Sequence, residues 1–173
     1  MSNALFITVG TTEFDQLMKS IDVSSFFECV RNCRFTKITV QMGRGIHAPN
    51  ELKAYCERSG IEFELYQFKN TLDADMKAAD LIISHCGAGS ILEVITMGKP
   101  LVVVVNTSLQ DNHQTELSDA LTEGKYCYST VPDELVDTLL KRLQNPLNDG
   151  VSKLFPINNP DILPSMLDRM FGF

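Results

Sequence analysis

Apolar runs of strand length recur along the chain and alternate with segments whose apolar residues have helical spacing. The runs occupy residues 4–9, 36–41, 61–66, 80–84 and 101–105. The helical patterns occupy residues 14–31, 51–59, 72–79, 90–98, 112–123, 132–144 and 161–171. This alternation predicts an α/β fold, a parallel sheet with helices on both faces. Because residues 80–84 and 101–105 are apolar almost throughout, we expect both to be central strands, with 101–105 in the middle.

Length and charge limit the classes of partner. With 173 residues and 44% hydrophobic composition, we expect residues 1–173 to form one domain that buries about two-thirds of its unfolded surface. The 15 basic and 22 acidic side chains give a net charge of -7, which disfavours nucleic acid and anionic lipid as direct partners. No apolar stretch approaches the roughly 20 residues of a membrane span, and no basic leader precedes the first strand pattern. We therefore expect a cytoplasmic protein with no direct membrane span.

Five cysteines occur in the sequence, and none of them forms a CxxC pair. An odd number without paired spacing favours reduced thiols over a disulfide framework or a zinc site. The pattern is therefore typical of a reducing compartment.

Ligands of open parallel sheets bind where loops leave the carboxyl ends of the strands, beside the topological switch point. The loops with unusual polar chemistry at that edge are residues 10–13, 43–49, 85–90 and 106–114. We expect the binding site among them.

The sequence "LIISHCGAGSILEV" turns from a buried strand into a helix that we expect to start near Ser90. Gly87 and Gly89 allow the backbone to approach a ligand, and the helix N-terminus offers free N–H groups to an anion. His85 and Ser90 can donate hydrogen bonds to a diphosphate, and Glu93 can accept from two ribose hydroxyls. The alternative is a capping box, in which Ser90 and Glu93 satisfy the helix N-terminus without a ligand.

Two other ligand motifs fit less well. The dinucleotide fingerprint GxGxxG requires glycine where the chain has Leu92, which disfavours NAD. Asp73-Ala74-Asp75 resembles the metal-holding motif of single-lobed glycosyltransferases, but its place in the first turn of a helix indicates compensation of the helix dipole. We therefore expect neither a cofactor nor a metal.

Read as a whole, His85-Cys86-Gly87-x-x-Ser90-x-x-Glu93 resembles the donor-nucleotide box of glycosyltransferases with two Rossmann-like halves. The resemblance implies that His85 and Ser90 contact the diphosphate of a UDP-sugar, that Glu93 holds its ribose, and that the backbone of residues 87–89 (Gly87, Ala88 and Gly89) lines the phosphate turn. It also implies sugar contacts from Asn112 and Gln114, downstream in "NTSLQDNHQTEL". On local pattern alone, the segment is better explained as a polar helix cap with Asp111 as the N-cap.

Five segments appear in an order that resembles one branch of these enzymes: "FITVGTTEFDQL", "TVQMGRG", "ADLIISHCGAGSILE", "GKPLVVVVN" and "DNHQ". That branch is the UDP-N-acetylglucosamine-binding catalytic subunit of the eukaryotic dolichol-linked chitobiose-forming N-acetylglucosaminyltransferase. The resemblance implies the C-terminal, donor-binding half of a GT-B glycosyltransferase. It implies transfer of GlcNAc, with inversion, from the substrate UDP-GlcNAc to dolichol-diphosphate-GlcNAc. Cys86 departs from the alanine common in the family.

The same resemblance implies a partner. A chain of this length leaves no residues for an acceptor-binding half, so a membrane-anchored subunit at the cytosolic face of the endoplasmic reticulum would supply it, with the general base. The apolar stripe of residues 161–171 would then form a C-terminal helix that reaches this heterodimer partner. The alternative is a stripe that packs on its own domain, and both can hold along one helix.

Two further loops are candidates for the cleft. Gly10, Thr11 and Thr12 follow the first strand and offer hydroxyl and N–H groups to phosphate or acceptor, although strand-to-helix capping explains them equally. Arg44, between two glycines, can pair with a diphosphate or with the partner, or it can be a solvated loop residue.

Three rival functions remain open from the sequence. Cys86 could be the nucleophile of a hydrolase with His85 or His113 as base, although no third orienting residue is evident. A small buried cysteine is the other interpretation of Cys86. Split bacterial exopolysaccharide transferases share the architecture, and a non-catalytic nucleotide-sugar-binding module would carry the same donor residues.

Overall fold

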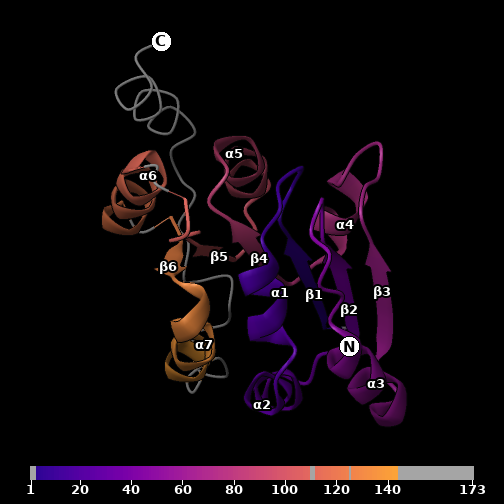
Figure 1. The fold of residues 1–173 in the computed structure, drawn as a ribbon. Coiled ribbons are helices and arrows are strands. Elements are labelled where there is room, and N and C mark those ends of the chain that lie inside the picture. The colour runs from indigo at the N-terminus through magenta and orange to yellow at the C-terminus, as the bar shows by residue number, and fades with distance from the viewer. Residues whose placement is uncertain (1–2, 110–111, 125, 144–173) are drawn as a thin grey trace.

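The computed structural model describes residues 3–109, 112–124 and 126–143, and the chain there forms one parallel sheet between two layers of helices (Figure 1). The six strands are β1 (Ala4–Thr8), β2 (Lys37–Gln41), β3 (Glu62–Tyr66), β4 (Leu81–His85), β5 (Leu101–Val104) and β6 (Tyr128–Thr130). Their order is β3-β2-β1-β4-β5-β6, and every neighbouring pair is parallel. The predicted α/β fold class is therefore confirmed.

Helices cover both faces of the sheet. One face carries α1 (Asp15–Ile21), α2 (Ser24–Asn32), α3 (Asn50–Ser59) and α7 (Leu135–Leu143), which follows the short 3-10 helix η1 (Pro132–Glu134). The other face carries α4 (Asp73–Ala78), α5 (Ala88–Thr96) and α6 (Asn112–Glu123). Alternate residues of each strand supply the two cores: Leu5 and Ile7 of β1 face the first helical layer, and Phe6 faces the second. Burial on both faces fixes the register of the strands.

The middle of the sheet differs from the expectation. Strands β1 and β4 are the central pair, whereas β5 lies next to the edge strand β6. Val102 and Val104 pack on one helical layer and Leu101 and Val103 on the other. A continuous apolar run therefore reports burial on both faces, which β5 shares with the central strands. Strand β6 was not predicted because three residues carry too little periodicity.

The single helix expected over residues 14–31 is two helices, α1 and α2, that are separated at Asp22 and Val23. The apolar stripe explains the break. Helix α1 buries Leu17 and Ile21, and a continuous helix would next bury residues 24, 25 and 28, which are Ser24, Ser25 and Glu28. Helix α2 instead buries Phe26, Cys29 and Val30, so the chain must turn between the two stripes.

The strand order places a topological switch point between β1 and β4, because the chain moves outward from β1 first on one side and then on the other. Thr8 and Ser84 are paired in register at the carboxyl ends of these strands. The residues that follow them, from Gly10 and from His85 onward, therefore leave the sheet side by side. In the part of the chain that the structure describes, no helix has both the length and the apolar character for crossing a bilayer.

Candidate functional site

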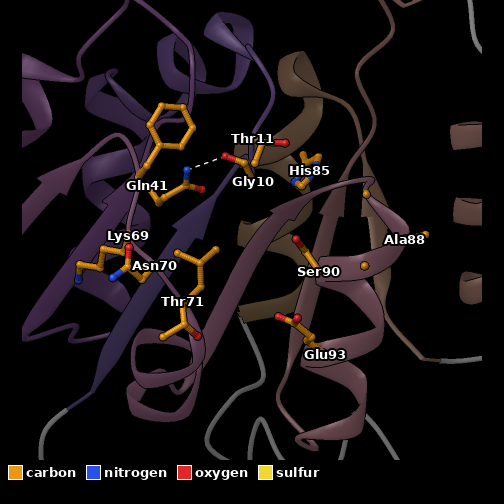
Figure 2. Close-up of a pocket in the computed structure, with 14 residues that line it drawn as sticks. Gly10, Thr11, Gln41, Lys69, Asn70, Thr71, His85, Ala88, Ser90 and Glu93 are labelled. Atoms are coloured by element: carbon orange, nitrogen blue, oxygen red, sulfur yellow. Dashed lines mark hydrogen bonds between the residues drawn. The ribbon is translucent and has the colours of Figure 1, made fainter.

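A cavity of about 400 Å³ lies at the carboxyl edge of the sheet, above the switch point (Figure 2). Three segments line it: residues 10–11 after β1, residues 68–72 after β3, and residues between His85 and Glu93 in the β4–α5 turn and helix α5. Gln41, at the end of β2, also lines it. The structure thus brings together eight of the predicted site residues, six from the β4–α5 turn and helix and two from the loop after β1, and adds the β3–α4 loop and Gln41 to them.

Helix α5 begins two residues earlier than expected. Its N-cap is Gly87, no side chain caps it, and the first intrahelical bond runs from the Ile91 N–H to the Gly87 carbonyl at 3.0 Å. The N–H groups of Ala88, Gly89 and Ser90 therefore have no partner within the helix and face the cavity. They carry the positive end of the helix dipole, which suits an anion.

Ser90 and Glu93 are the third and sixth residues of α5, so they lie on one face of the helix. Both side chains point into the cavity (Figure 2). Within the described residues, neither side chain forms a hydrogen bond or an ion pair. The capping-box alternative is therefore wrong, because in that box the Ser90 side chain would accept from the Glu93 N–H and the Glu93 side chain from the Ser90 N–H, whereas the helix has no side-chain cap and its N-cap is Gly87.

His85 ends β4 and packs between two glycines. A Cβ atom on Gly10 would lie 2.7 Å from Cε1 of the imidazole, and one on Gly87 would overlap Nε2. Gly10 also has a φ of 61°, in the left-handed region that favours glycine. Both glycines are therefore needed for the ring to sit beside the start of α5, with Nε2 toward the turn at Gly87.

The environment of His85 is unusually apolar. The residue is 8% exposed, and Nδ1 is buried without a hydrogen-bond partner in the described part of the chain. Burial lowers the pKa of His85 from 6.5 to about 4, although the nearby Thr8 backbone opposes the shift. The imidazole is therefore neutral at pH 7 and carries a single ring N–H.

The β1–α1 turn contributes only part of its predicted residues to the cavity. Gly10 and Thr11 line it. Thr12 instead bonds its hydroxyl to the Val9 carbonyl at 2.8 Å, and its own carbonyl accepts from the Arg44 N–H at 2.9 Å. The Arg44 side chain is exposed and is not among the residues that line the cavity. Thr12 and Arg44 thus brace two neighbouring loops against each other.

The β3–α4 loop was missed by the sequence analysis, although it follows a strand at the same edge. Residues 68–72 form the wall opposite α5. Lys69 is held there by Glu64 at 2.8 Å and Asp75 at 2.9 Å, and it lies 4.0 Å from the centre of the Tyr66 ring. Two carboxylates already balance its charge, so the N-terminus of α5 remains a separate positive element of the cavity. Because this loop directly follows a predicted strand, its position in the sequence could have identified it as part of the site.

The β5–α6 connection lies outside the cavity lining. Oε1 of Gln114 accepts from the Asn106 N–H at 3.2 Å, and the Asn106 side chain accepts from the Ser108 N–H and hydroxyl at 3.1 and 2.6 Å. The Nε2 group of Gln114 has no bond to the described residues. Asn112 is the first residue of α6, and the structure does not describe its side chain. The predicted sugar contacts thus stay predictions.

The rival nucleophile Cys86 is unsuited to catalysis. Its thiol is buried, donates to the Gln114 carbonyl at 3.2 Å, and has a pKa that burial raises to about 12. A thiol with that pKa is protonated at pH 7 and is a poor nucleophile. The structure therefore contradicts the hydrolase alternative, and all five cysteines are free thiols.

The acidic pair before α4 also has a structural role. Asp73 and Asp75 lie in the first turn, where Asp73 pairs with Lys77 at 2.6 Å and Asp75 with Lys69. Carboxylates at a helix N-terminus compensate its dipole, as the sequence indicated. Among the described residues, no group of three His, Cys, Asp or Glu side chains is placed to hold a metal. The helix expected at residues 161–171 lies outside the described residues.

Known proteins are similar to this chain in fold and in sequence. The chain is 39% identical over 127 residues to the human UDP-N-acetylglucosamine transferase subunit ALG13, covering 73% of this chain but 11% of that protein's length. The solution structure of ALG13 matches with a TM-score of 0.66 and 25% identity, over 98% of this chain and 95% of that one. The crystal structure of MurG from Acinetobacter baumannii also gives a TM-score of 0.66, at 18% identity, over all of this chain and 50% of that one.

A family model also matches most of the sequence. It is described as the glycosyltransferase family 28 C-terminal domain, and it matches residues 4–153. The matched region contains every described strand and the whole cavity. The chain therefore belongs to the glycosyltransferase family 28 C-terminal domain family.

Proposed function

We propose that this chain is the donor-binding subunit of an N-acetylglucosaminyltransferase that uses UDP-GlcNAc. The observation that carries the proposal is the free start of α5, where three backbone N–H groups and the side chains of Ser90 and Glu93 lie at one cavity without hydrogen-bond partners among the described residues. A nucleoside diphosphate matches them, with phosphate at the helix N-terminus and ribose hydroxyls at the Glu93 carboxylate. The donor is a substrate, and we propose no cofactor.

The reaction would be displacement of UDP from the anomeric carbon by an acceptor hydroxyl, with inversion. Negative charge then develops on the leaving diphosphate, and preorganised donors stabilise it. The α5 N–H groups, the Ser90 hydroxyl and the neutral His85 imidazole, through Nε2, would supply these donors. The sugar would extend toward α6, where Gln114 Nε2 and Asn112 are candidates for hydroxyl contacts.

We further propose that a membrane-anchored partner completes the enzyme and binds dolichol-diphosphate-GlcNAc at the cytosolic face of the endoplasmic reticulum. The comparison with MurG supports a second, acceptor-binding half. The same fold accounts for 50% of the MurG chain, and the other half of that chain has no counterpart among the described residues. The partner would supply the base and would hold residues 161–171. The human relative is named as a transferase subunit.

Reconstitution tests this proposal. The chain is combined with candidate membrane partners, UDP-GlcNAc and dolichol-diphosphate-GlcNAc, and the product is identified by mass. We expect the addition of one GlcNAc in the presence of both subunits, and no addition with either subunit alone. Donor binding without transfer by any complex would instead indicate a non-catalytic nucleotide-sugar module. Transfer only to a bacterial lipid-linked acceptor would indicate the exopolysaccharide class.

A further inference from the structure

Gln41 is a buried amide at the floor of the cavity, and its side chain is 1% exposed. Its Nε2 group donates to the Gly10 carbonyl and to the Gln67 carbonyl, each at 2.6 Å. Its Oε1 atom accepts from the Thr8 hydroxyl at 2.5 Å and from the Val9 N–H at 3.2 Å. All four hydrogen-bonding positions of the amide are therefore occupied by protein atoms.

These bonds connect the β1–α1 loop to the β3–α4 loop, and the backbone ladder of the sheet does not connect them. The last ladder bonds at this edge run from the Val9 N–H to the Gln41 carbonyl and from the Met42 N–H to the Tyr66 carbonyl. Gly10 and Gln67 lie one residue beyond these bonds, where the chains would otherwise separate. The Gln41 side chain replaces the ladder there, and Figure 2 shows it reaching toward Gly10.

Both ends of the Gly10 peptide segment are fixed by this network. The Gly10 N–H donates to the Thr8 hydroxyl at 3.2 Å, and that hydroxyl donates to Gln41. Gly10 in turn contacts the His85 ring, because its Cα leaves no room for a Cβ beside Cε1. The second anchored residue, Gln67, precedes the loop that forms the opposite wall.

We propose that Gln41 is a positioning residue that fixes the separation of the two walls of the donor cavity. The inference rests on the proposed function and deepens it, because it concerns the same nucleotide site. The two backbone carbonyls that bind Gln41 explain why this position requires an amide side chain. Carbonyl oxygens only accept hydrogen bonds, so holding two of them requires a side chain with two N–H donors. Glutamate has the same shape but offers at most one donor, and only when it is protonated.

The test compares three variants in the reconstituted two-subunit complex. Gln41→Glu keeps the shape and removes the donors, and Gln41→Met removes the polar group. Thr39→Val is the matched control, because Thr39 is buried on the same strand and the same side as Gln41 but is not among the residues that line the cavity. The readouts are the melting temperature, the KM values for UDP-GlcNAc and for the acceptor, and the inhibition constant of UDP.

We expect Gln41→Glu and Gln41→Met to raise the donor KM and the UDP inhibition constant at least tenfold, with the acceptor KM unchanged. Thr39→Val should change neither constant more than twofold. A donor KM for Gln41→Glu within twofold of the unmutated value would overturn the inference, as would an equal rise in Thr39→Val. Absence of transfer by the unmutated complex would overturn the proposed function and the inference that rests on it. Normal transfer by that complex, with an unchanged donor KM in Gln41→Glu, would overturn the inference alone, so the two failures are distinguishable.

A second measurement uses the unmutated chain and covers the case in which both Gln41 variants fail to fold. In NMR spectra of the labelled protein, the side-chain NH2 protons of Gln41 should exchange slowly with solvent. Addition of UDP should shift the backbone amide signals of Gly10 and of residues 67–69 in parallel across the titration. Rapid exchange of the NH2 protons, or shifts confined to one loop, would contradict the inference.

Discussion

The turns that leave the neighbouring strands β4 and β5 carry similar polar residues, but their polar groups differ in what they bind. After β4, the first N–H groups of α5, the side chains of Ser90 and Glu93, and Nδ1 of His85 have no hydrogen-bond partners among the described residues. After β5, the side chains of Asn106 and Gln114 accept hydrogen bonds from the connection itself. The first turn is open to a ligand, whereas the second is largely closed on itself.

This difference identifies the ligand site better than residue type does. Buried polar groups usually find partners within the protein, so the buried, unpartnered Nδ1 of His85 beside the uncapped start of α5 is a sign of function. By sequence pattern, both turns can be explained as helix caps or as binding sites. Only the hydrogen bonds separate them, and four predictions follow that can break or sharpen the contrast.

The largest effect is expected at Gly87, where an added Cβ would overlap the His85 ring. Gly87→Ala should lower kcat/KM for UDP-GlcNAc at least about 100-fold, because the imidazole and the start of α5 lose their alignment. Gly89→Ala is the control for folding, since its Cβ would meet nothing within 4 Å and alanine favours a helix. The His85 ring signals in NMR should move in Gly87→Ala and not in Gly89→Ala. Unchanged His85 ring signals in Gly87→Ala would contradict the packing of this ring between Gly10 and Gly87.

The open turn should also make stability depend on pH. Because the folded-state pKa of His85 is about 4 and the unfolded value is 6.5, the unfolded chain binds the proton first as the pH falls. The free energy of unfolding should therefore lose about 3 kcal/mol from this group between pH 6.5 and pH 4, and none above pH 6.5. Denaturant unfolding across this range should show the loss in the unmutated chain and in His113→Gln, but not in His85→Gln. An equal loss of unfolding free energy in His85→Gln would show that a group other than His85 causes the pH dependence.

Glu93→Ala should weaken donor use by about 2–3 kcal/mol, because charged hydrogen bonds to the ribose are lost. The melting temperature should not change, since the exposed side chain bonds to no described residue. UDP inhibition should weaken by the same factor as donor use. Glu123→Ala, an exposed glutamate at the end of α6, is the matched control. Normal kinetics with a lowered melting temperature would return Glu93 to a structural role.

Gln114→Ala should have the smallest kinetic effect and should separate the sugar from the nucleotide. Loss of the bond to the Asn106 N–H should lower the free energy of unfolding by about 1 kcal/mol. The proposed sugar contact predicts a rise of about fivefold in the UDP-GlcNAc KM, which corresponds to one hydrogen bond. UDP inhibition should remain as in the unmutated enzyme. Weaker inhibition by UDP would mean that the β5–α6 connection binds the nucleotide after all.

Much of the fold could be predicted from the sequence because it depends on burial. Five strands and the two-sided helical cover follow from apolar runs and helical spacing. The apolar pattern does not distinguish β5, which is next to an edge strand, from the central β1 and β4, because all three are buried on both faces. It also contains the signal for the break between α1 and α2, in the two serines at positions 24 and 25, but a single long helix accounts for the rest of the segment.

The β4–α5 turn could be predicted because its residues are close together in the sequence. Glycines, a helix start and Glu93 fall within nine residues of His85. The rest of the cavity depends on contacts between distant segments. Gln41 lies 31 residues from Gly10 and 26 from Gln67, and no local pattern indicates that its amide joins them. The β3–α4 loop belongs to the site only because β3 ends at the same edge of the sheet.

The central claim is that the open start of α5 binds the diphosphate of the donor. A crystal structure of the chain with UDP, or UDP-GlcNAc, at saturating concentration tests it most directly. We predict a phosphate on the N–H groups of Ala88, Gly89 and Ser90, with the ribose hydroxyls on the Glu93 carboxylate. Nucleotide density at the β5–α6 connection or anywhere else, with this turn unoccupied, would contradict the account.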